Sequence, residues 1–162
     1  MDSRVILLAE DRDDDVFTTR KALRDAFIEN PLKIVHDGEQ AIAYLNGTGR
    51  FSDRSKYPLP ALLLLDLKMP RKNGFEVLAW LRACKQFRSL PVIVLTSSQD
   101  LTDVKRAYHV GATSFLWKPL GFKDACKVAE FLPVVTTTTP EPLSPPVDIL
   151  SVDSATFKQT TT

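Results

Sequence analysis

The chain has 162 residues, with 21 lysines and arginines against 20 aspartates and glutamates, which gives a formal net charge of +1. This length is close to the commonest size of a single domain, and the balanced charge excludes the broad basic surface of a nucleic-acid or anionic-membrane binder. No apolar stretch approaches membrane-spanning length, and the two cysteines lack a disulfide or metal-ligand spacing, so we expect a cytoplasmic protein in a reducing compartment.

Strands and helices are expected to alternate along the chain, five of each. The expected strands are short runs rich in leucine and branched residues, which is typical of parallel strands buried on both faces. An amphipathic helix follows each strand, and Gly111 and Pro133 mark the ends of the fourth and fifth helices. In chain order the expected elements cover residues 5–9, 13–27, 32–36, 38–45, 61–65, 74–84, 92–95, 100–110, 115–117 and 122–132.

Five such units predict an α/β protein with a doubly wound parallel sheet, because each parallel crossover needs a helix and is almost always right-handed. Of the known strand orders we choose 2-1-3-4-5, the flavodoxin-like order, because the units end near residue 132 and a longer sheet would need more of them. The predicted architecture is a three-layer sandwich in one domain that spans residues 1–132.

Two segments fall outside this alternation. Residues 47–60 form a long connection in which Phe51 and Tyr57 stand among basic residues, and both a contact surface and a solvated loop anchored by its aromatics fit this composition. Residues 133–162 contain five prolines, eight threonines and three serines. This tail has too few large apolar groups to offset its conformational entropy, so we expect a disordered spacer.

Four of the expected strands end on polar residues suited to a phosphoryl group: Glu10-Asp11, Asp66, Thr96-Ser97 and Lys118. Because parallel strands end at one edge of the sheet, where open α/β sheets bind ligands, we expect these residues to form one site. Three carboxylates in one place call for a hard cation such as Mg²⁺, which prefers oxygen ligands. A carboxylate in such a site can attack phosphorus, with the lysine and the hydroxyl complementing the phosphoryl oxygens.

Four motifs stand in a fixed order along the chain: Glu10-Asp11, Asp66-Leu67-Lys68-Met69-Pro70 with Asn73-Gly74, Thr96-Ser97, and Lys118-Pro119. Together they resemble the receiver domain of bacterial two-component response regulators, a CheY-like domain, and the resemblance spans residues 4–132. The segment Tyr57-Pro58-Leu59-Pro60 and the strand after it are similar to single-domain regulators paired with phytochrome-type sensor kinases.

The resemblance implies a role for each residue of the set. Asp66 would be the phosphoacceptor, Thr96 the switch hydroxyl, and Phe115 the switch aromatic. Lys118 would pair with the phosphoryl group, and the bond between Lys118 and Pro119 would be cis. The implied cofactor is Mg²⁺, for which Mn²⁺ can substitute, bound by Asp11, Asp66 and the backbone carbonyl of Lys68, with Glu10 acting mainly through water.

The implied function is that of a signalling switch rather than an enzyme. A sensor histidine kinase of phytochrome type would donate the phosphoryl group. The face formed by residues 100–110, 115–117 and 122–132 would then signal by protein contact or form a homodimer, and neither nucleic acid nor membrane is an expected partner. Two alternatives stay open: a phosphorylation-independent adaptor, and an aspartyl-phosphate hydrolase of the haloacid dehalogenase type, which carries a second acidic residue where this chain has Lys68.

Several of these polar residues also have a structural interpretation. Asp11 and Asp66 could cap helices, and Ser98 is expected to cap the fourth helix. The run Asp13-Asp14-Asp15 is interpreted as mostly a solvated helix start. Surface or packing roles are expected for His36, His109, Trp80 and Trp117.

Overall fold

The structure, a computed structural model, describes residues 4–97 and 101–133. Its strands are β1 (Ile6–Ala9), β2 (Leu32–Val35), β3 (Leu62–Asp66), β4 (Val92–Thr96) and β5 (Ser114–Trp117). Its helices are α1 (Asp13–Asp25), α2 (Gly38–Asn46), α3 (Gly74–Ala83), α4 (Leu101–Val110) and α5 (Phe122–Ala129), with short 3-10 turns η1 (Gly49–Phe51) and η2 (Lys85–Phe87). The expected capping role of Ser98 and most of the expected tail lie outside the described residues.

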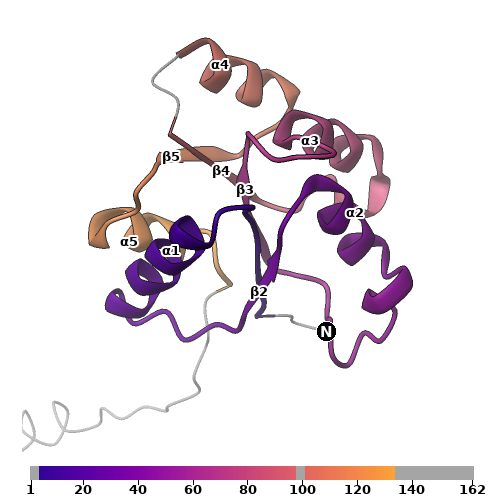
Figure 1. Cartoon of the computed structure of the whole chain (residues 1–162), viewed down its shortest axis with the longest axis horizontal. Coiled ribbons are helices and arrows are strands. Elements are labelled where there is room, and N and C mark those ends of the chain that lie inside the picture. Colours follow the sequence, from indigo (N-terminus) through magenta and orange to yellow (C-terminus); the bar gives the residue numbers. More distant parts are fainter. Residues whose placement is uncertain (1–3, 98–100, 134–162) are drawn as a thin grey trace, which may run out of the picture.

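The molecule is a three-layer sandwich around one parallel sheet (Figure 1). The five strands pair in the order β2-β1-β3-β4-β5, which confirms the predicted strand order. Helices α2, α3 and α4 pack on one face of the sheet, and α1 and α5 pack on the other. The predicted α/β flavodoxin-like class is therefore the class observed.

The central strands are apolar throughout because both of their faces are covered. Successive residues of a strand point to opposite faces, so Leu63 and Leu65 join the core beneath α2 and α3, whereas Leu62 and Leu64 join the core beneath α1 and α5. Strand β3 is fully buried along its length. Such a strand has no solvent-facing side, which explains why its sequence shows no polar alternation.

Helices α1 and α5 each end at least two residues earlier than the sequence predicted. Helix α1 ends at Asp25 rather than at residue 27, because Phe27 adopts a left-handed conformation with φ of 59°. The amide of Ile28 then donates to the carbonyl of Leu23, which closes the helix end, and the Phe27 ring is exposed rather than part of the apolar stripe. Helix α5 ends at Ala129, and the amides of the next residues make i to i−3 bonds that tighten the chain before Pro133.

The long connection before β3 is packed onto α2. The buried Phe51 ring lies 5.2 Å from the Tyr44 ring and 5.1 Å from the Tyr57 ring. Arg54 donates from its guanidinium to the carbonyls of Tyr44 (2.7 Å) and Leu45 (2.6 Å) in the last turn of α2, and the Tyr44 carbonyl also accepts from the amide of Gly47. The aromatic side chains of this loop therefore act as anchors, and Arg54 holds it to the helix end.

Both cysteines are free thiols, Cys84 half-buried and Cys126 exposed. Among the described residues, no helix has the length and apolar character needed to cross a bilayer.

Candidate functional site

The strand register places the predicted polar residues in one row at the carboxyl edge of the sheet. Ala9 pairs with Leu65, so Glu10 stands beside Asp66, and Asp66 in turn pairs with Leu95. Thr96 pairs with Trp117, the residue before Lys118. The four strand ends that the sequence singled out therefore meet at the same level of the fold.

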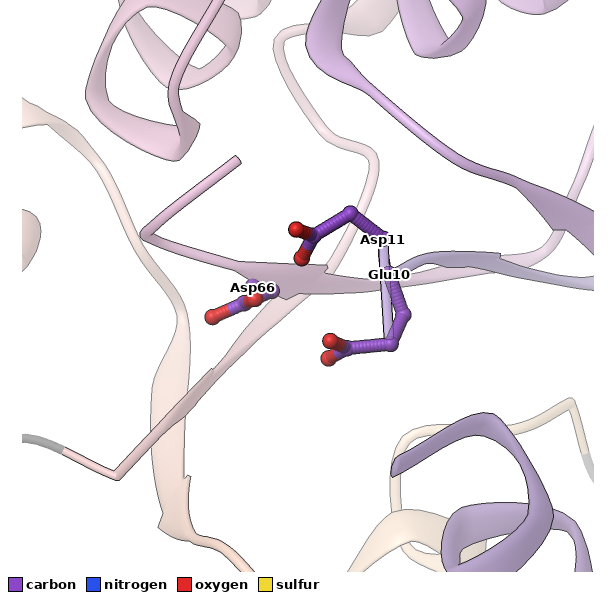
Figure 2. A group of neighbouring side chains, drawn as sticks. All are labelled: Glu10, Asp11 and Asp66. Atoms are coloured by element: carbon purple, nitrogen blue, oxygen red, sulfur yellow. The ribbon is translucent and has the colours of Figure 1, made fainter. Parts of the chain in front are cut away.

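Three carboxylates gather at this edge. Each of Glu10, Asp11 and Asp66 offers an oxygen within 4.8 Å of the others, and Figure 2 shows these side chains turned toward a common space. Beside them lies a cavity of about 440 Å³ that the following residues line: Asp11, Arg12, Asp15, Asp66, Lys68, Ser97, Lys118 and Pro119. A set of hard oxygen donors at this spacing suits Mg²⁺ or Mn²⁺.

Lys118 lies at the centre of the acidic group. Its ammonium is 3.0 Å from Glu10 Oε2, 2.9 Å from Asp15 Oδ2 and 3.4 Å from Asp66 Oδ2. The interpretation of Asp13-Asp14-Asp15 as a solvated helix start is wrong for Asp15, because the first turn of α1 places this carboxylate over the sheet edge. Asp11 lies before Arg12, the N-cap of α1, so no helix-face spacing in the sequence singled out Asp15.

Burial and crowding perturb the acids of the site. Burial raises the pKa of Glu10 to about 7, the Asp66 charge adds to this, and the Lys118 ammonium opposes it. Burial also raises the pKa of Asp66, against the opposing charge of Lys118. For Lys118 burial alone would lower the pKa, but hydrogen bonding to Asp15 and the charges of Asp66 and Glu10 raise it overall. A divalent cation would favour the charged forms of both carboxylates and so oppose these upward pKa shifts.

The connection after β3 folds back over Asp66. The backbone N–H of Lys68 donates to Asp66 Oδ1 at 3.3 Å, and the N–H of Gly74 donates to the Leu67 carbonyl at 2.9 Å. A Cβ at Gly74 would lie 2.6 Å from the Asp66 carbonyl oxygen, so the start of α3 leaves no room for a side chain there. Asn73 caps α3 by accepting from the N–H of Glu76. The Asn73-Gly74 motif thus positions the loop beside the site.

The remaining predicted residues lie on β4 and β5. Thr96 is buried at the end of β4, and its carbonyl accepts from the N–H of Lys118 at 2.9 Å. Phe115 is half-buried between two exposed aromatics, with ring centroids 5.9 Å from Tyr108 and 5.3 Å from Trp117, both edge to face. Trp117 is thus an exposed member of an aromatic row rather than a core residue. The peptide bond between Lys118 and Pro119 is cis.

Comparison with known proteins identifies the family to which this chain belongs. The family model described as response regulator receiver domain matches residues 6–130. The chain belongs to the response regulator receiver domain family. This is a family of two-component signalling switches rather than of turnover enzymes.

Three relatives show how close the similarity is. Response regulator Rcp1 of Synechocystis sp. is 35% identical over 127 residues, which cover 78% of this chain and 84% of Rcp1. A structure of the Mn²⁺-bound form of Rcp1 has a TM-score of 0.66 and 33% identity, covering 86% of this chain and 99% of that one.

The other two relatives are described as phytochrome response regulators. The bacteriophytochrome response regulator RtBRR has a TM-score of 0.73 and 36% identity, covering 98% of this chain and 95% of that one. The phosphorylated cyanobacterial phytochrome response regulator RcpA has a TM-score of 0.71 and 29% identity, covering 86% of this chain and 99% of that one. The family therefore includes relatives solved with a divalent metal and in a phosphorylated form.

Proposed function

We propose that this receiver accepts a phosphoryl group on Asp66 from the phosphohistidine of a sensor histidine kinase. The observation that carries the proposal is the setting of Asp66: its carboxylate borders the cavity, lies 3.4 Å from the Lys118 ammonium and stands within 4.8 Å of the Glu10 and Asp11 oxygens. In this proposal residues 1–132 form the receiver and residues 133–162 a spacer.

The transfer is a displacement at phosphorus. An Asp66 carboxylate oxygen forms a bond to phosphorus as the bond from phosphorus to the histidine ring nitrogen breaks, and that nitrogen keeps the electron pair. The product is an acyl phosphate on Asp66. The Lys118 ammonium and the Thr96 hydroxyl donate to its oxygens, so the chain contributes positioning and charge neutralisation.

The proposed cofactor is Mg²⁺, for which Mn²⁺ can substitute. Asp11, Asp66 and the backbone carbonyl of Lys68 would hold it directly, and Glu10 through water. When bound, the cation supplies positive charge against the phosphoryl oxygens. The crowded carboxylates of this chain and the Mn²⁺-bound form of Rcp1 support this assignment.

The proposed partner and output follow from the relatives and from the exposed face of α4, β5 and α5. Since two relatives are described as phytochrome response regulators, a phytochrome-type kinase is the proposed donor. The output face carries four exposed large apolar side chains, Leu101, Tyr108, Trp117 and Phe122. These suit a protein contact or a homodimer, with Thr96 and Phe115 coupling the site to that face.

Intact mass spectrometry with acetyl phosphate and Mg²⁺ tests the proposal against both alternatives. A single phosphate adduct in the wild type that is lost in Asp66→Asn supports the switch. Release of free phosphate at high turnover would favour the hydrolase, although Lys68 stands where such enzymes carry their second acid. If the wild type takes up no phosphate, the proposal is overturned and the phosphorylation-independent adaptor is the function that remains.

A further inference from the structure

Asp15 is the one carboxylate around Lys118 that lies outside the predicted acidic set. It lies in the first turn of α1, borders the cavity, and pairs with the Lys118 ammonium at 2.9 Å, the shortest of the lysine's three contacts with carboxylates. Its neighbours Asp13 and Asp14 are exposed and do not line the cavity. The contact is therefore particular to Asp15 and is not a general property of the acidic run.

Lys118 already serves several carboxylates, because its ammonium donates to Glu10 and Asp15 and lies 3.4 Å from Asp66 Oδ2. An ammonium group has three N–H donors, and three carboxylates surround it. A phosphoryl group on Asp66 would bring new anionic oxygens that need one of these donors. The ammonium can turn fully toward these oxygens only by loosening its contact with Glu10 or with Asp15.

Asp15 is the partner that can leave at the lowest cost. The Glu10 side chain is 1% exposed, so it cannot lose its cation without leaving a buried charge unpaired, and the Asp66 carboxylate is itself converted to the acyl phosphate. The Asp15 side chain is 24% exposed, and Arg12 Nε lies 3.8 Å from its Oδ2 as a second cationic partner. A released Asp15 would thus keep both water and Arg12.

We propose that Asp15 is a positioning residue that holds Lys118 in the unphosphorylated protein and competes with the incoming phosphoryl group for its ammonium. This inference rests on the proposed function, because it concerns the same transfer to Asp66. Asp15 acts through Lys118 and does not contact the phosphoryl group. It sets how much phosphodonor is needed to load the site.

The test measures the phosphorylation rate against acetyl phosphate concentration at saturating Mg²⁺, by intact mass, for wild type, Asp15→Asn, Asp15→Glu and Asp14→Asn. Asp15→Asn should lower the half-saturating phosphodonor concentration about threefold and leave the maximal rate within about twofold. Asp15→Glu restores the carboxylate, so its half-saturating phosphodonor concentration should return toward that of wild type. Asp14→Asn removes the same charge from the same helix turn and should change little.

The outcomes separate the inference from the proposed function. If wild type is phosphorylated and Asp15→Asn needs as much phosphodonor as wild type or more, the inference is overturned and the proposed function stands. The inference also fails if Asp14→Asn reproduces the effect, since bulk charge would then explain it. If wild type is not phosphorylated, both fail. Thermal melting of all four proteins checks that the variants fold.

Discussion

Replacing Glu10 by glutamine should flatten the pH dependence of stability in the metal-free protein. Burial raises the pKa of Glu10 from 4.5 to about 7, so the folded state holds the proton more tightly than the unfolded state does. A raised carboxyl pKa contributes stability that is fully present below the unfolded value of 4.5 and is lost as the pH rises through about 7. Glutamine has no proton to lose and keeps an oxygen that accepts from Lys118.

The size of the expected stability difference follows from the shift in the pKa of Glu10. A difference of about 2.5 pKa units at ~1.4 kcal/mol per unit sets an upper limit of roughly 3 kcal/mol. Between about pH 5 and about pH 8, wild type should lose on the order of 2 to 3 kcal/mol of unfolding free energy relative to Glu10→Gln. Asp66, whose pKa burial also raises, remains in both proteins, but it interacts with Glu10, so the measured difference belongs to the pair of acids.

Urea denaturation at several pH values in the presence of a chelator measures this difference. Glu39→Gln is the matched control, because Glu39 is an exposed acid on α2 and should follow wild type. Saturating Mg²⁺ should remove most of the loss at high pH, because the cation compensates the ionised carboxylates. If the unfolding free energies of wild type and Glu10→Gln in the chelator change with pH in parallel, with equal m-values, the reasoning is refuted.

Three further variants probe the site and its support. Without metal, Lys118→Ala should cost about 3 kcal/mol of unfolding free energy in urea denaturation, because buried carboxylates lose their cation. Mg²⁺ should recover part of this loss. Unchanged stability would show that the ion pairs of Lys118 contribute little. Asp11→Asn should raise the Mg²⁺ concentration at half-saturation at least about tenfold by calorimetry, whereas Asp13→Asn should not. If Asp11→Asn and Asp13→Asn weaken Mg²⁺ binding equally, overall negative charge rather than direct ligation by Asp11 would explain the affinity. Arg54→Ala should cost about 2 kcal/mol of unfolding free energy, since it removes hydrogen bonds to carbonyls in the last turn of α2, yet it should leave the phosphorylation rate unchanged. A slower phosphorylation rate would show that the loop and the site are not independent.

The fold could be predicted because each strand and each helix has a recognisable pattern of apolar residues in the sequence. A strand covered on both faces must be apolar throughout, so runs such as Leu62 to Leu65 stand out in the sequence. Helix ends were less predictable, because the end of α1 depends on the left-handed backbone at Phe27, a conformation that the sequence does not mark. The packing of Phe51 against Tyr44 likewise depends on contacts across the loop.

The residues of the site could be predicted only in part. The position of Asp66 at the end of a buried strand is a local feature, whereas the contact between Asp15 and Lys118 joins residues 103 positions apart. Which of three successive aspartates faces the lysine is decided by the rotation of α1 about its axis. That rotation is fixed when Val16 and Leu23 pack into the core with α5, so the sequence of the helix start alone could not reveal it.

Locating the phosphoryl group on the chain tests the central claim most directly. Borohydride reduces an acyl phosphate to an alcohol, so a phosphorylated aspartate becomes homoserine and can be found by peptide mapping. After phosphorylation with acetyl phosphate and Mg²⁺, we expect homoserine at position 66, and none when a chelator replaces the metal. Conversion at Glu10 or Asp11 instead, or phosphate held at a residue that borohydride does not reduce, would contradict the assignment of Asp66.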